Sequence, residues 1–390
     1  MTRALRGLRA PIIALLAIEL LDELVFGARE AAWPAIRDEL DLSYVQIGLL
    51  LSVPTYSSAV LEPVFGVLGD SRRRRAVVVG GGIAMATALV LVAAAPGFLV
   101  LLVAFALLFP STGAFVSLSQ ATLMDLEPQR RELNMTRWSI AGGVGAVAGP
   151  LLLILFTALG GGWRALFATL AVVALGLTVV AATTHSRLSP HTGRPSFRAA
   201  VGAVRRPLVA RWLVLLEFAD LLLDVLLGYV ALYLVDEAGA SAQVGSLGVA
   251  VWTGAGLAGG LGVILLLRHV DGLRYLRASA LATLVLFPAF LLVPGLTAKL
   301  ALLAVVGLVT AGWYSIPKAR LYDALSGQSG AAVALGSVAG LIAGTFPLVI
   351  GLVAERYGIE VALWALLAGP LVLLIGVPRS RDDERSLPPR

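Results

Sequence analysis

Long apolar segments follow one another along almost the whole chain. Hydrophobic residues make up 58% of its 390 residues and charged residues only 14%, whereas an ordinary soluble domain carries about 25% charge. A helix needs roughly 20 mostly apolar residues to cross a bilayer. Runs of about that length predict twelve membrane-spanning helices, near residues 11–31, 45–69, 76–95, 98–120, 137–159, 165–184, 209–234, 244–267, 275–294, 298–318, 329–354 and 359–377. We therefore expect an all-α integral membrane protein.

The connectors between these segments divide the chain. The one long connector runs from Thr183 to Pro207, is polar and basic, and separates two groups of six spans. This pattern predicts four parts: an N-terminal six-helix bundle at 1–184, a cytoplasmic linker at 185–208, a C-terminal six-helix bundle at 209–378 and a cytoplasmic tail at 379–390.

Basic residues are distributed unevenly between the two sets of loops. Most arginines fall in loops on the side of the N-terminus, and we assign only five basic residues to the opposite side: Arg29, Arg37, Arg164, Lys299 and Arg356. Loops rich in Lys and Arg face the cytoplasm, so both termini are predicted to be cytoplasmic, in the plasma membrane of a bacterium-like cell. These loops account for the net charge of +6, and nucleic acid is not expected as a partner.

The two halves of the chain share a sequence repeat. The segment Ile18–Asp22 recurs as Leu216–Asp220, 198 residues later, and the same offset places Ser117–Asp125 on Ser315–Asp323. A repeat of about half the chain, with ionisable groups at equivalent membrane depths, is typical of transporters built from two bundles. The repeat therefore predicts two pseudo-symmetric bundles around a central cavity.

Acidic residues lie inside several of the predicted spans. A charged group at this depth costs roughly 3 kcal/mol on insertion scales, so it usually faces a polar cavity or a partner. The predicted proton-coupling or substrate-cavity acids are Glu19, Asp22, Glu23, Glu62, Glu217, Asp220 and Asp224. In each half, three of them share one helix face. Apolar surroundings and neighbouring carboxylates disfavour ionisation, so at least one acid in each cluster is expected to gain and lose a proton.

Two other interpretations of the polar residues remain open. Some acids could pair with Arg137 or Lys318 and only hold helices together. Aromatic rings beside carboxylates would instead suit a cationic or amphipathic organic molecule, although they could equally serve packing. The residues that could line such a cavity are Phe26, Arg137, Trp252, Trp313, Tyr314 and Lys318.

The loop after the second span resembles a known family signature. Gly66, Asp70, Arg74 and Arg75 match the loop motif of the major facilitator superfamily, and segments near Asp41 and Leu61 are similar to its fosmidomycin-resistance branch of drug exporters. The resemblance implies twelve helices in two bundles that work by alternating access. It also implies that Asp70 and its neighbours form a gating motif that latches the bundles. The alternative is that the arginines merely anchor the loop to anionic lipid.

Two further segments bear on the resemblance. Gly145, Gly149 and Pro150 in the fifth span resemble the signature of antiporter members and are predicted to form a hinge, with ordinary small-residue packing as the alternative. The fourth span lacks the arginine of many proton-coupled exporters of the superfamily, because Phe109 stands at the expected position. Their detailed mechanism therefore cannot be transferred directly.

No enzymatic chemistry is indicated. The chain has no cysteine, its three histidines lie in predicted loops and no phosphate-binding loop is present, so we expect no cofactor, no bound metal and a proton gradient as the energy source. The predicted function is proton-coupled efflux of a small organic, cationic or amphipathic solute by a monomer. Its expected partners are the solute, protons and membrane lipid. The alternatives are an importer of a nutrient or metabolite, and a membrane sensor or lipid-handling protein.

Overall fold

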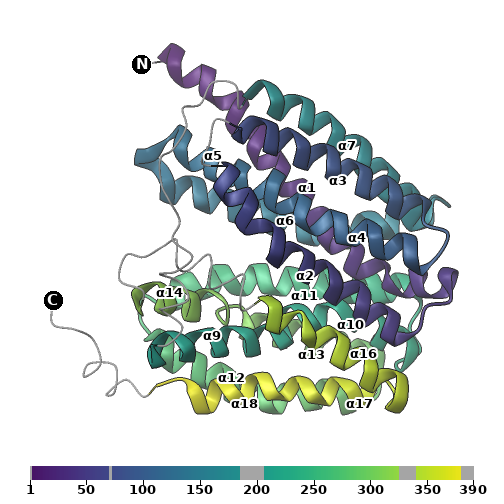
Figure 1. Ribbon diagram of the computed structural model, residues 1–390. Coiled ribbons are helices and arrows are strands. Elements are labelled where there is room, and N and C mark those ends of the chain that lie inside the picture. Colours follow the sequence, from purple (N-terminus) through teal and green to yellow (C-terminus); the bar gives the residue numbers. More distant parts are fainter. Residues whose placement is uncertain (1, 70–72, 185–205, 325–339, 379–390) are drawn as a thin grey trace.

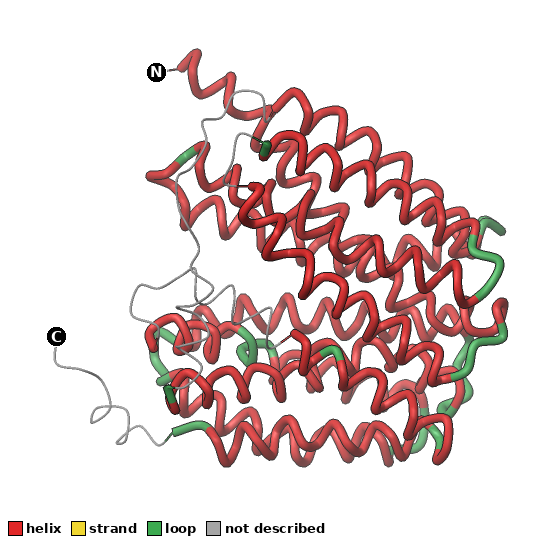
Figure 2. Tube along the Cα trace, viewed as in Figure 1, coloured by secondary structure: helices red, strands yellow, loops and turns green. Residues whose placement is uncertain are grey.

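The computed structural model describes residues 2–69, 73–184, 206–324 and 340–378. Within these ranges almost every residue is helical (Figure 2). The helices of the N-terminal half are α1 (Thr2–Leu40), α2 (Tyr44–Gly69), α3 (Arg74–Ala94), α4 (Phe98–Thr112), α5 (Leu118–Leu126), α6 (Arg131–Ala158) and α7 (Gly162–Thr184). Those of the C-terminal half are α9 (Pro207–Asp220), α10 (Leu226–Asp236), α11 (Ala242–Leu266), α12 (Gly272–Leu292), α13 (Leu296–Thr310), α14 (Ser315–Ala324), α16 (Thr345–Tyr357), α17 (Ile359–Trp364) and α18 (Ala368–Gly376).

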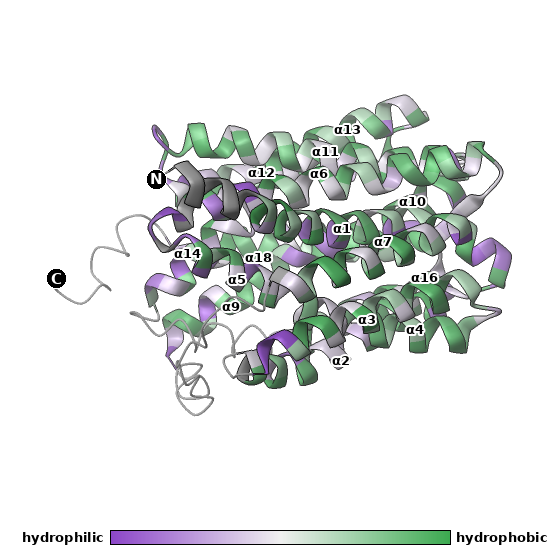
Figure 3. Ribbon diagram, turned by 90° about the horizontal axis from the view of Figure 1, so that it is seen from above, coloured by the Kyte–Doolittle hydropathy of each residue, from purple (hydrophilic) through white to green (hydrophobic). Residues whose placement is uncertain are grey.

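These helices make up the predicted spans. Eleven helical segments in the described residues are long and apolar enough to cross a bilayer, and hydrophobic residues cover most of their length (Figure 3). The remaining span is α1. This helix is long enough to cross a bilayer, but it is not among the eleven apolar segments because its apolar run carries Glu19, Asp22 and Glu23. It was predicted at 11–31, but the helix continues from Thr2 to Leu40. The prediction of an all-α membrane protein with two bundles of six spans is confirmed.

The two bundles meet at one end of the molecule and diverge at the other (Figure 1). We call the side on which α1 begins and α18 ends the near side, and the opposite side the far side. Far-side hydrogen bonds join the bundles: Tyr44 N donates to Glu355 Oε2 (2.8 Å) and Leu348 N donates to Ser52 Oγ (3.1 Å). Ser246 Oγ donates to the carbonyl of Ala31 (3.1 Å). The structure is therefore closed on the far side.

In each half of the chain, the span at the equivalent position of the sequence repeat is interrupted. The span of α4 and α5 is interrupted by a π-helical segment, η1 (Gly113–Ser117), and the corresponding span of the second half is interrupted between α13 and α14, at residues 311–314. The offset of 198 residues relates the two positions. A second π-helical segment, η4 (Leu221–Val225), joins α9 to α10 and has no counterpart in α1, where residues 23–27 are regular helix. Such π-helical turns often mark functional positions.

Two of the five basic residues assigned to the far side are buried. Arg29 is only 5% exposed and Lys299 only 7%, and both lie within helices. Lys299 Nζ donates to Tyr233 Oη (2.6 Å) and to the carbonyls of Phe290 (3.0 Å) and Leu291 (2.8 Å). The lysine thus caps the last turn of α12, where unpaired carbonyls attract a cation. Lys299 therefore stays on the far side, where it stabilises the end of α12.

Candidate functional site

The acids of α1 lie against a face of α6 made of small residues. Glu19 is 8% exposed, and a Cβ placed on Gly142 would lie 2.6 Å from its Oε1. A Cβ on Gly145 would lie 2.5 Å from the carbonyl oxygen of Leu20 and 3.0 Å from Glu23 Cβ. Only glycine permits helices to approach this closely. The acids are therefore held in place by a tight seam between α1 and α6.

Asp22 and Glu23 open into a small cavity between α1 and α4. It has a volume of about 110 Å³, and its lining residues are Asp22, Glu23, Val25, Phe26, Arg29, Leu108, Phe109 and Thr112. Two carboxylates, one guanidinium and two aromatic rings thus share a space large enough for a few water molecules. Phe26, predicted as a cavity residue, lies in this wall.

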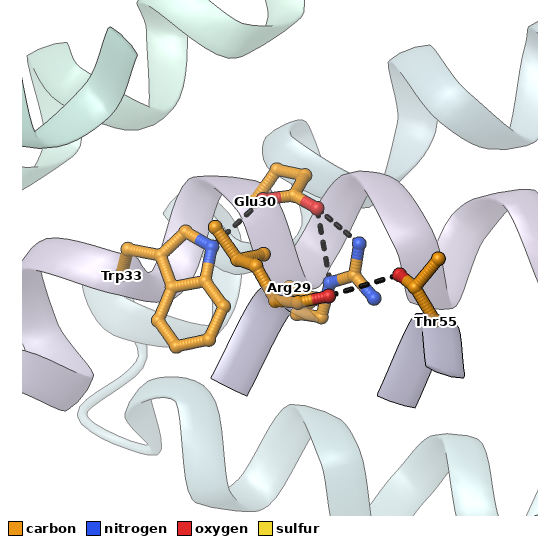
Figure 4. Close-up of polar contacts among 5 residues, drawn as sticks. Arg29, Glu30, Trp33 and Thr55 are labelled. Carbon is orange, nitrogen blue, oxygen red and sulfur yellow. Dashed lines mark hydrogen bonds and ion pairs between the residues drawn. The ribbon is translucent and has the colours of Figure 1, made fainter. Parts of the chain in front are cut away.

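A buried charged pair that sequence analysis missed lies one turn further along α1. Arg29 Nε donates to Glu30 Oε1 (3.0 Å), Arg29 Nη2 binds the same oxygen, and Trp33 Nε1 donates to Glu30 Oε2 (2.7 Å) (Figure 4). The guanidinium carbon lies 4.9 Å from the ring centre of Phe26 and 4.7 Å from that of Phe109. A signal was present, because Phe26, Arg29, Glu30 and Trp33 follow the i, i+3, i+4 and i+7 spacing of one helix face.

The acids of the second bundle reach this cluster through Asp224. Asp224 interacts electrostatically with Glu30 and Arg29, and it also repels Glu23 of α1. Asp220 is repelled by Asp224 and Glu217, and Lys318 attracts both Asp220 and Glu217. In the part of the chain that the structure describes, the buried Glu217 Oε2 has no hydrogen-bond partner. A chain of interacting carboxylates therefore runs from one bundle to the other.

Two other predicted polar residues lie outside this chain of acids. Glu62 on α2 is exposed, accepts a hydrogen bond from Ser58 Oγ (2.5 Å) and packs beside Gly113. Arg137 on α6 donates to Asn134 Oδ1 (3.1 Å) and lies 3.8 Å from Glu127. The predicted pairing of Arg137 with a cavity acid is therefore replaced by a contact near the start of its own helix.

The residues of the gating motif are only partly described. Asp70 lies outside the described residues, and Gly66 lies in the last turn of α2. Arg74 Nη1 donates to Asp125 Oδ2 (2.8 Å), while Arg75 is exposed. The contact between Arg74 and Asp125 joins α3 to α5 and thus lies within the N-terminal bundle.

The predicted hinge residues lie in the seam. A Cβ on Gly149 would lie 2.5 Å from Ala28 N, and the Pro150 ring would lie 3.0 Å from a Cβ on Gly27. Helix α6 nevertheless continues from Arg131 to Ala158 through Pro150. These contacts support the packing alternative, because the small residues of both helices face each other at backbone distance.

The predicted aromatic residues of the second bundle differ in exposure. Trp252 is buried beside Gly307, and the fully buried Trp313 donates from Nε1 to Ser279 Oγ (2.8 Å). Tyr314 is exposed, and Lys318 Nζ lies 5.2 Å from its ring centre. The two tryptophans therefore contribute to packing inside the bundle, while Tyr314 and Lys318 are accessible.

The fold and the site together define a membrane transport protein. Two related bundles of six spans enclose ionisable residues at their interface, which is the architecture of secondary transporters. Comparison with known families confirms the resemblance seen in the loop motif. The chain matches the Major Facilitator Superfamily over residues 24–346 and belongs to it.

Individual relatives are more distant. The chain is 28% identical over 160 residues to the fosmidomycin resistance protein of Escherichia coli (strain K12), a match that spans only 40% of this chain and 39% of that protein. A crystal structure of a bacterial homolog of the human lysosomal transporter Spinster, in an inward-facing and occupied conformation, has a TM-score of 0.74 at 16% identity and covers 94% of this chain and 93% of that one. The crystal structure of the nucleoside transporter NupG has a TM-score of 0.75 at 13% identity and covers 94% of this chain and 98% of that one. At these identities the solved structures establish the fold alone.

Proposed function

We propose that this transporter exports a small organic solute, cationic or amphipathic, in exchange for protons. The observation that carries the proposal is the group of acids inside the spans: Glu19 is buried, Asp22 and Glu23 line one cavity with Arg29, and the buried Glu217 Oε2 of α9 has no hydrogen-bond partner among the described residues. Groups this deep in a membrane protein usually mark ion or proton pathways. Their number exceeds that of the cations beside them, Arg29 and Lys318.

Protons and a cationic solute are alternative ways to neutralise these acids. Protonation removes the repulsion between Glu23 and Asp224 and favours the far-side-closed arrangement. Loss of the protons restores the negative charge, which can then attract a cation. Because both ligands relieve the same repulsion, their binding is mutually exclusive, and this competition links the two flows in opposite directions.

Two observations support a cationic or amphipathic solute and transport out of the cell. Phe26 beside Asp22 and Glu23, and the exposed Tyr314 beside Lys318, provide ring faces next to charged groups. A transporter whose relative confers resistance is most simply explained by efflux. With the near side in the cytoplasm, as the arginine distribution predicts, the structure is the state that would receive a solute from the cell.

Reconstituted protein tests the proposal directly. In proteoliposomes under an imposed proton gradient, with ethidium and tetraphenylphosphonium as probe cations, we expect proton flux that depends on the probe. Glu19→Gln and Asp22→Asn should each abolish this coupled flux. Asp38→Asn is the matched control, because Asp38 is an exposed acid near the far-side end of the same helix. Undiminished coupled flux in both cavity variants would refute the role of these acids as proton carriers.

The same preparation separates the alternatives. A proton gradient that drives the solute in the same direction as the protons would indicate an importer. Specific binding or lipid movement without solute-coupled proton flux would indicate a sensor or lipid-handling protein.

A further inference from the structure

Arg29 is the cation of α1 within the membrane-spanning part of the site. It is 5% exposed, its partner Glu30 is 2% exposed, and the pair is completed by the indole of Trp33. Charged groups are rarely buried this deeply without a role, because removing them from water is costly and a well-packed apolar pair would be equally stable. We therefore expect the pair of Arg29 and Glu30 to have a functional role in addition to any part in holding α1 in place.

Three phenylalanine rings lie close to the guanidinium of Arg29. Its carbon lies 4.9 Å from the ring centre of Phe26, 6.0 Å from that of Phe105 and 4.7 Å from that of Phe109. Aromatic faces stabilise a cation without neutralising it, so the guanidinium remains available to a second anion.

Arg29 lies between two sets of carboxylates. On one side is Glu30, which it binds. On the other side are Asp22 and Glu23, which line the same cavity, and Asp224 of η4, with which Arg29 interacts electrostatically. The rings of α4 that lie against the guanidinium are uncharged, and Tyr229 of α10 interacts electrostatically with Glu30. One cation is therefore shared among four acids.

The position of Glu30 places this pair at the boundary between the bundles. A Cβ on Gly228 of α10 would lie 3.6 Å from Glu30 Oε2. Gly228 is the repeat counterpart of Glu30, 198 residues later, and Leu227 is that of Arg29. Two equivalent positions can be adjacent only near the axis that relates the bundles. A charge at this place acts on both bundles at once.

We propose that Arg29 is the positioning cation that couples protonation to conformational change. It pairs with Glu30 while Asp22, Glu23 and Asp224 carry protons, and it turns to these acids when they lose them. This inference rests on the proposed proton coupling and adds the group that transmits it.

The test uses the absence of cysteine from the chain. Single cysteines at Leu159 and Leu292, both strongly exposed at the far-side ends of α6 and α12, can carry spin labels without removing native thiols. Pulsed EPR then measures the far-side distance between the bundles as a function of pH in the full-length protein in lipid nanodiscs. In the wild-type background we expect a distance change with a defined pH midpoint.

The two members of the pair should shift this midpoint in opposite directions. Arg29→Gln removes the positive charge that favours ionised acids, so the midpoint should move to higher pH by about one unit or more. Glu30→Gln releases Arg29 to the acids and should move the midpoint to lower pH. Arg29→Lys keeps the charge and should remain close to wild type. The double variant Arg29→Gln/Glu30→Gln removes both charges, so no buried charge is left unpaired to cause misfolding. Its pH midpoint should also return toward that of the wild type.

The possible outcomes are distinct. Opposite shifts with recovery in the double variant support the inference. Shifts in the same direction, or none, in a protein whose wild-type distance still responds to pH would overturn the role of Arg29 and leave proton coupling intact. A wild-type protein with no pH response and no coupled proton flux would refute the proposed function, and the inference with it.

Discussion

The seam between α1 and α6 allows a prediction whose size follows from the structure. A Cβ on Gly145 would lie 2.5 Å from the carbonyl oxygen of Leu20, about 0.7 Å closer than van der Waals contact allows. The obstructing atom belongs to a helix backbone and cannot rotate away, so Gly145→Ala must push the helices apart. Overpacking of this kind costs about 1–3 kcal/mol, against at most about 1 kcal/mol gained from the better helix propensity of alanine.

A matched control exists on α11. A Cβ on Gly256 meets no atom within 4 Å, so Gly256→Ala should keep the propensity gain without the clash. We expect the two variants to differ by about 2 kcal/mol in unfolding free energy, measured as apparent melting temperature in detergent under one scan rate. Gly145→Ala should also reduce coupled flux, since it displaces Glu19 and Glu23. Equal melting temperatures for the two variants would show that the seam is not tightly packed.

Two further predictions concern single polar residues. Lys299→Met should lower the unfolding free energy by about 1–3 kcal/mol, because it leaves the carbonyl of Phe290 without its charged donor, whereas the carbonyl of Leu291 still accepts a hydrogen bond from Tyr233 Oη. Thermal unfolding beside Lys299→Arg as the charge-retaining control checks this, and an unchanged melting temperature would contradict it. Solute exchange without a gradient should fall as the pH is lowered, because protons then occupy the carboxylates that bind the cation. Asp224→Asn should flatten this profile in a radiolabelled exchange assay, and a profile of unchanged slope would count against competition at Asp224.

Much of the fold could be predicted because its causes are local. Apolar runs of bilayer length specify spans, and the repeat around Glu19 and Glu217 specifies two bundles. The acids could also be found, because a carboxylate in an apolar run is conspicuous. What these patterns lack is the partner of each group, which depends on packing between helices distant in sequence.

Arg29 shows where this limit lies. Counting basic residues by side of the membrane assigned it to the far side, because it stands near the end of the first span predicted at 11–31. The helix in fact continues to Leu40, so Arg29 lies inside it with its charge balanced by the next residue in the chain. The i, i+3, i+4 and i+7 spacing of Phe26, Arg29, Glu30 and Trp33 places them on one helix face but does not say which of them pair. The seam could not be distinguished from a hinge for a related reason: glycines that permit close approach and glycines that permit bending have the same sequence pattern.

The repeat and its departures from symmetry have different consequences for the mechanism. Matched acids at Glu19 and Glu217, and at Asp22 and Asp220, give each bundle its own set of carboxylates for the proposed proton coupling. Near the axis, however, Glu30 lies close to its counterpart Gly228, and the buried pair of Arg29 and Glu30 corresponds to the uncharged Leu227 and Gly228. Duplication therefore supplies two sets of acids but only one charged pair at this position. In the proposed mechanism, a single cation that serves two clusters is nearest to only one of them at a time. This asymmetry would let an otherwise symmetric protein distinguish its protonated from its deprotonated state.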